Sequence, residues 1–169
     1  CFISHHHPDH AGGISAFARF GVTVVSTSGN FDYFNLLAKS KDTRSSPEVT
    51  NNSNSSLVFD SVPKGKSKMY YLDSMPIIAY EMGTQTKHTS EFVCYYIPRS
   101  QTLFAGDLVL FPSSNIRRQG NRALSVLNLI NQQKLQVRRI ITSWPLKGYK
   151  AFGTKEELEK SVADFINAK

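Results

Sequence analysis

The sequence contains few cysteines and no long apolar run, and both shortages narrow the classes of protein to be considered. Its two cysteines, Cys1 and Cys94, form no Cys-x-x-Cys pair and provide no disulfide framework. No apolar stretch approaches the roughly 20 residues that a membrane-spanning helix needs. No basic segment followed by an apolar one resembles a signal peptide. We therefore expect neither a disulfide scaffold nor a membrane-spanning protein, and the default expectation is a soluble protein of the cytoplasm.

Acidic residues are also scarce, because 13 Asp and Glu stand against 20 Lys and Arg, which gives a formal net charge of +7. Such a balance favours anionic partners. The basic clusters at residues 64–68, at Arg117-Arg118 and at Arg138-Arg139 are scattered and lack the interleaved aromatic residues of a single-strand binding groove. We interpret them as solvated surface. The expected partner is a small-molecule substrate, and the positive net charge favours an anionic one. Nucleic acid is a less favoured alternative.

The 169 residues, of which 40% are hydrophobic, suffice for one sizeable core, so we expect a single domain over 1–169. Apolar periodicity predicts that strands and helices alternate along the chain. A polar segment at 40–56 is expected to be a surface loop. Helices are predicted at 14–20, 31–39, 121–134 and from Thr154 onward, and strands at 22–26, 57–60, 68–72, 75–81, 92–97, 102–105 and 136–142. This pattern alone supports an α/β or α+β domain.

The segment around which the chain is organised is Ser-His-His-His-Pro-Asp-His at residues 4–10. In an extended backbone His5 and His7 point to the same side, whereas His6 points to the other and is expected to make a hydrogen bond rather than bind metal. Asp9 and His10 come from the turn that follows. Imidazole and carboxylate ligands suit zinc, so the segment predicts a metal site.

Three motifs, in this order along the chain, resemble those of the metallo-β-lactamase-fold hydrolases. They are His-x-His-x-Asp-His at 5–10, Lys-His-Thr-Ser at 87–90, and Ala-Gly-Asp at 105–107. The resemblance extends from Cys1 to about Leu146. It implies an αββα sandwich of four layers. Members of the family begin with several strands before the first motif, so we expect the chain to be truncated at its amino terminus and the first sheet to be incomplete.

The resemblance also implies the ligands of a first zinc ion. His5, His7 and His88 occupy the positions of the three histidines that hold it in the family. Three protein ligands with one open position are typical of catalytic rather than structural zinc. One or two zinc ions are expected, with iron or manganese as alternatives.

A second ion is implied on Asp9 and His10, with Asp107 bridging the two metals. Asp9 is also the expected catalytic residue, which orients a shared hydroxide and transfers its proton. The family usually adds one more histidine after the last strand, but this chain has Trp144 in that region and no histidine after His88. We therefore expect the second site to bind metal more weakly than the first.

The favoured function is zinc-dependent hydrolysis of an ester, thioester or lactone by a metal-bound hydroxide. Two alternatives remain within the same fold. One is a phosphodiesterase or nuclease, which the positive charge favours but for which no basic recognition segment is evident. The other is a metal-binding scaffold that has lost catalysis with the missing histidine. An adventitious histidine cluster or expression tag does not explain the two later motifs.

Overall fold

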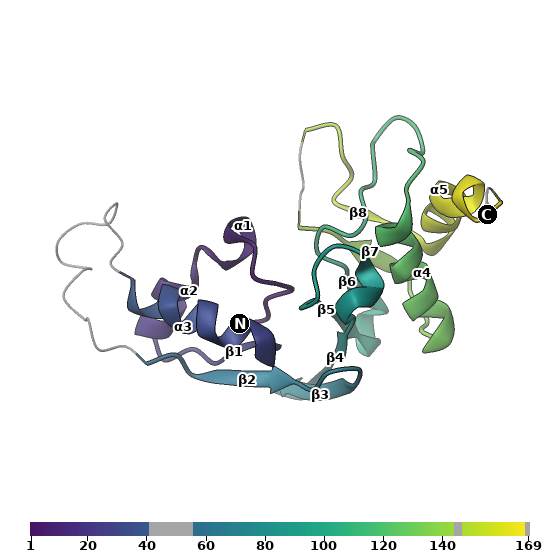
Figure 1. Ribbon diagram of the computed structural model, residues 1–169. Coiled ribbons are helices and arrows are strands. Elements are labelled where there is room, and N and C mark those ends of the chain that lie inside the picture. The colour runs from purple at the N-terminus through teal and green to yellow at the C-terminus, as the bar shows by residue number, and fades with distance from the viewer. Residues whose placement is uncertain (41–55, 144–146, 168–169) are drawn as a thin grey trace.

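The computed structural model describes residues 1–40, 56–143 and 147–167, and their strands form two sheets (Figure 1). The first sheet pairs β1 (Val24–Thr27) with β2 (Phe59–Val62) in parallel, and Phe2 adds a parallel bridge to Val25. The second sheet has the order β3-β4-β5-β6-β7-β8. Its strands are β3 (Ser67–Leu72), β4 (Met75–Glu81), β5 (Val93–Ile97), β6 (Thr102–Phe104), β7 (Arg139–Ile141) and β8 (Phe152–Gly153).

Helices lie on the outer side of each sheet (Figure 1). Beside the first sheet are α2 (Ile14–Arg19) and α3 (Phe31–Lys39), whereas α1 (Pro8–Ala11) lies nearer the middle of the molecule (Figure 1). Beside the second are α4 (Asn121–Gln132) and α5 (Lys155–Asn167). Short 3-10 turns complete the connections: η1 (Ser28–Asn30), η3 (Gly83–Thr86) and η4 (Pro98–Ser100). No helix within the described ranges is long and apolar enough to cross a membrane.

The alternation of side chains along the strands produces three separate cores. In β1, Val24 packs with α2 and α3, whereas its neighbour Val25 faces the second sheet. In β5, Val93 packs in the core between the sheets, whereas Cys94 joins the core under α4 and α5. The layers therefore run helix, sheet, sheet, helix, which confirms the predicted αββα architecture.

Most of the predicted helices and strands are present with observed boundaries that lie within two residues of the predicted ones. The strand predicted at 57–60 is instead β2 at Phe59–Val62, and the short strand β8 was not predicted. The final helix begins as expected, because Thr154 and Glu157 exchange side-chain to backbone hydrogen bonds of 3.0 and 3.2 Å. The predicted loop at 40–56 falls almost entirely outside the described residues, as does Trp144.

Candidate metal centre

The histidine segment follows the bridge of Phe2 to β1 and passes into α1. The turn that the sequence predicts after His7 is in fact the short helix α1, and His7 is its N-cap residue. The carbonyl oxygen of His7 accepts hydrogen bonds from the backbone nitrogens of His10 and Ala11, both at 2.9 Å. Pro8 occupies the first helical position, where a missing N–H costs nothing. This bend returns the chain toward the site immediately after His7.

Neighbouring side chains fix the His5 ring, which is fully buried. Phe92 stacks against it with ring centroids 4.8 Å apart and an interplanar angle of 23°. The hydroxyl of Ser4 lies 3.0 Å from His5 Nδ1. A partner at Nδ1 fixes the ring so that Nε2 is the atom presented to the site. Neither Ser4 nor Phe92 was singled out from the sequence, although Ser4 directly precedes the motif.

His88 lies on the loop between β4 and β5, as predicted. Lys87 adopts a left-handed conformation with a φ of 54°, which ends η3 and redirects the chain at His88. The buried hydroxyl of Thr86 accepts from the backbone nitrogen of His88 at 3.1 Å and lies 3.3 Å from the carbonyl oxygens of Gly83 and Thr89. One hydroxyl thus holds both ends of the loop that carries the histidine.

Asp107 follows β6, also as predicted, and its position depends on Gly106. Gly106 has a φ of 57°, and a Cβ there would lie 2.8 Å from Phe92 and 3.3 Å from Ser4. Only glycine combines this conformation with so close an approach. The same two residues that fix His5 therefore also contact the turn that delivers Asp107.

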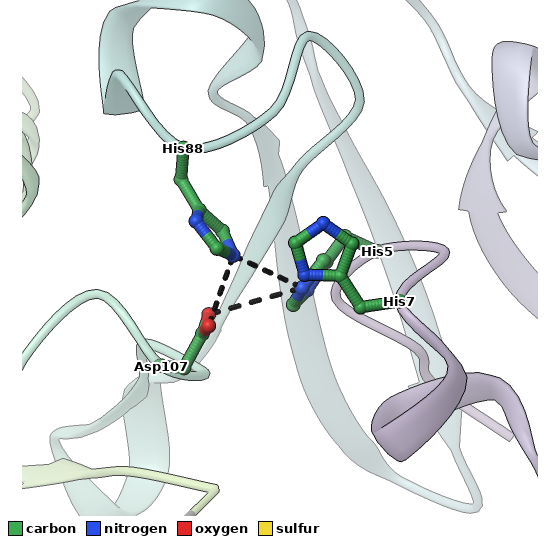
Figure 2. Close-up of side chains that lie close together, drawn as sticks. All are labelled: His5, His7, His88 and Asp107. Atoms are coloured by element: carbon green, nitrogen blue, oxygen red, sulfur yellow. Dashed lines mark hydrogen bonds and ion pairs between the residues drawn. The ribbon is translucent and has the colours of Figure 1, made fainter.

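His5, His7, His88 and Asp107 converge, and one ligand atom from each lies within 4.8 Å of the others (Figure 2). His88 Nε2 is 3.2 Å from His5 Nε2 and 2.9 Å from Asp107 Oδ2, and His5 Nε2 is 3.9 Å from Asp107 Oδ1. Two nitrogens bound to a tetrahedral zinc at its usual bond length lie about 3.3 Å apart. The separations in this cluster therefore fit a shared metal ion.

The protonation of the cluster also suits metal binding. Burial, reinforced by the neighbouring imidazoles, lowers the pKa of His5 to about 2. Burial likewise lowers the pKa of His88, and Asp107 opposes that shift. Both rings are thus neutral at pH 7, the form that binds metal. Within the described part of the chain, His88 Nδ1 and Asp107 Oδ1 are buried without a hydrogen-bond partner.

Asp9 and His10 lie next to this cluster rather than within it. The Asp9 side chain is 45% exposed, and its Oδ2 is 3.5 Å from His10 Nε2. The His10 ring centroid is 4.3 Å from that of His5. His6 points away, as predicted, and its Nδ1 is 3.0 Å from Asn30 Oδ1. The metal roles of Asp9 and His10, and the catalytic role of Asp9, stay predictions.

Comparison with known proteins agrees with this geometry. The profile of the metallo-beta-lactamase superfamily matches residues 2–144. No curated protein matches significantly. Among solved structures, a metallo-beta-lactamase from Pontibacter korlensis has a TM-score of 0.61 at 18% identity, over 99% of this chain and 68% of that one. The metallo-beta-lactamase FIM-1 from Pseudomonas aeruginosa, in its mono-zinc form, has a TM-score of 0.60 at 18% identity, over 99% of this chain and 66% of that one.

A further similar structure is not named as a lactamase. It is the rubredoxin oxygen:oxidoreductase of Desulfovibrio gigas, with a TM-score of 0.63 at 11% identity, over 98% of this chain and 42% of that one. At such identities the structures establish the fold and not the reaction. The profile match covers most of the sequence and includes all four converging residues. The chain therefore belongs to the metallo-beta-lactamase superfamily.

Proposed function

We propose that the protein is a zinc-dependent hydrolase of ester, thioester or lactone bonds. The observation that carries the proposal is the convergence of three imidazoles and one carboxylate in one cluster. These ligand types suit zinc, with iron and manganese as alternatives. The thiol of Cys94 is buried in the core under α4 and α5, where burial raises its pKa, so it is suited neither to metal binding nor to nucleophilic attack.

Each residue has a distinct task in this proposal. The three clustered imidazoles would hold a first ion, and Asp107 would join it to a second ion held also by Asp9 and His10. Bound zinc would supply a Lewis acid and would lower the pKa of a water molecule to about 7. The carboxylate of Asp9, partly exposed at the start of α1, would orient the attacking water and accept its proton at Oδ2, which lies near His10 Nε2.

The test is turnover of activated esters, thioesters and lactones by purified protein with measured zinc content. Asp107→Asn keeps the size of the side chain but removes its charge, so we expect it to lose both metal and turnover. Asp73→Asn makes the same change in the exposed turn between β3 and β4 and serves as the matched control. Asp9→Asn is expected to keep the first ion and lose turnover. Equal activity of Asp107→Asn and Asp73→Asn would refute the proposal.

The same assays separate the alternatives. Turnover of bis-aryl phosphodiesters alone would favour the phosphodiesterase or nuclease that the +7 charge suggests. Tight metal binding without turnover of any of these substrates would favour a scaffold that has lost catalysis. If turnover increases with the iron content of the protein rather than with its zinc content, the functional metal is iron.

A further inference from the structure

A pocket of about 380 Å³ adjoins the metal cluster and shares Asp107 with it. Four basic residues line this pocket, and they come from three separate parts of the chain. Lys87 directly precedes His88, Arg117 and Arg118 lie on the segment between β6 and α4, and Arg122 is in the first turn of α4. The basic residues that look scattered in the sequence are therefore partly gathered at one place beside the candidate metal site.

The charge of this pocket is not balanced from within the protein. None of the four basic side chains forms an ion pair with a carboxylate of the described residues. Arg122 also opposes the α4 dipole, and the first turn of that helix contains no acidic residue. Four basic residues outnumber the one carboxylate, Asp107, that also lines the pocket, and a concave surface with an excess of one sign of charge concentrates ions of the other sign. The pocket is thus electrostatically complementary to an anion.

The backbone that carries the two adjacent arginines is held in place by Gln119. The Gln119 side chain accepts from the backbone nitrogen of Leu110 at 2.8 Å and donates to the Leu110 oxygen at 3.1 Å. It also donates to the hydroxyl of Ser161 at 3.1 Å, and its backbone nitrogen donates to the Ser161 oxygen at 2.8 Å. These bonds tie the segment to α5. Arg117 and Arg118 therefore project from a fixed backbone, which reduces the entropy lost on binding.

We propose that this pocket binds a phosphate-type group of the substrate, separate from the bond that is cleaved. Guanidinium groups match the oxygens of such groups in bidentate geometry. A phosphate carries about −1.5 to −2 charge at pH 7, which balances four basic residues better than one carboxylate does. The proposal rests on the proposed function, because that function places the scissile bond at the metal cluster.

The first test is calorimetric binding to the metal-loaded protein. The probes are phenylphosphonate, benzoate and benzyl alcohol, which offer a dianion, a monoanion and a neutral group on the same ring. The variant R117Q/R118Q removes two pocket charges. R138Q/R139Q removes the same charge from the exposed pair at the start of β7, outside the pocket. We expect phenylphosphonate to bind most tightly and its affinity to fall about tenfold or more in R117Q/R118Q alone.

Two results would overturn this assignment. Unchanged phenylphosphonate affinity in R117Q/R118Q would show that the anion binds only to the metal. Equal weakening in R138Q/R139Q would show that affinity comes from charge spread over the surface, as expected for nucleic acid. Affinity that is lost only from the pocket variant supports the assignment.

A kinetic comparison separates this proposal from the hydrolase proposal. The substrates are S-acetyl-2-mercaptoethyl phosphate and its neutral parent, S-acetyl-2-mercaptoethanol. We expect a lower KM for the phosphorylated thioester, and R117Q/R118Q should raise that KM toward the value for the neutral compound. Equal KM values in the unmodified protein would overturn the pocket assignment and leave the hydrolase standing. Phosphonate binding at the pocket without hydrolysis of either thioester, or of the activated esters and lactones of the first assay, would support the pocket and overturn the hydrolase.

Discussion

Replacement of Ser4 by alanine tests how the site holds His5, its most buried candidate ligand. The Ser4 hydroxyl lies 3.0 Å from His5 Nδ1, and both residues are buried, with exposed fractions of 2% and 0%. Ser4→Ala leaves that nitrogen without its partner. The tight packing of Gly106 against Ser4 leaves little room for water to replace the hydroxyl. The His5 ring then loses the contact that fixes its orientation.

The expected loss can be worked out from these contacts. Removing an outer partner of a metal-binding histidine typically lowers metal affinity about 10- to 100-fold. That range corresponds to about 1.4–2.7 kcal/mol of binding free energy. Stranding a buried polar atom costs about 1–3 kcal/mol of unfolding free energy. We therefore expect Ser4→Ala to weaken zinc binding by at least about tenfold and to lower the stability of the metal-free protein.

Competition with a chromophoric zinc chelator at pH 7.5 measures the affinity, and urea denaturation measures the stability. Ser125→Ala is the matched control, because it removes a buried hydroxyl that donates to the backbone oxygen of Arg122 within α4. We expect its zinc affinity to be unchanged. A Ser4→Ala protein that is less stable but binds zinc as tightly as before would refute the reasoning, because His5 would then not be the ligand that Ser4 holds.

Three further predictions concern stability. Because the pKa of His5 is lowered from 6.5 to about 2, the metal-free protein should lose stability as the pH falls below about 6.5, and equal urea midpoints at pH 7.5 and pH 5 would contradict this. Thr154→Ala should cost about 1 kcal/mol in urea denaturation, since it removes the hydroxyl that accepts a hydrogen bond from the backbone nitrogen of Glu157. Gly153→Ala should cost about 1–3 kcal/mol in thermal denaturation, because its Cβ would lie 2.2 Å from the Phe111 ring, and an unchanged midpoint would show that the ring moves aside freely.

The sequence predicted the convergence of His5, His7, His88 and Asp107 because these residues occur in short, ordered motifs. His5 and His7 share a face through the period of an extended chain, and Asp107 follows a strand with a clear apolar pattern. The strands and helices of the sandwich were predicted from the apolar periodicity of the sequence. The strand β8 was missed because the two residues Phe152–Gly153 are too few to show a period. It exists because it pairs with β7.

Features that depend on tertiary packing were not predicted. The stacking of Phe92 on the His5 ring joins segments that are 87 residues apart, and no local pattern predicts such a contact. The basic pocket was missed for the same reason, because Lys87 and Arg122 belong to elements that meet only in the folded chain. The sequence suggested dispersed charge, whereas the fold gathers part of it beside Asp107.

We expect one metal ion to be bound where His5, His7, His88 and Asp107 converge. Anomalous X-ray scattering from crystals of the zinc-loaded protein, recorded above and below the zinc edge, tests this claim most directly. We expect a zinc peak about 2.0–2.2 Å from a nitrogen of each histidine and from an oxygen of Asp107. A protein that retains no metal, or a zinc peak bound by other residues, would contradict it.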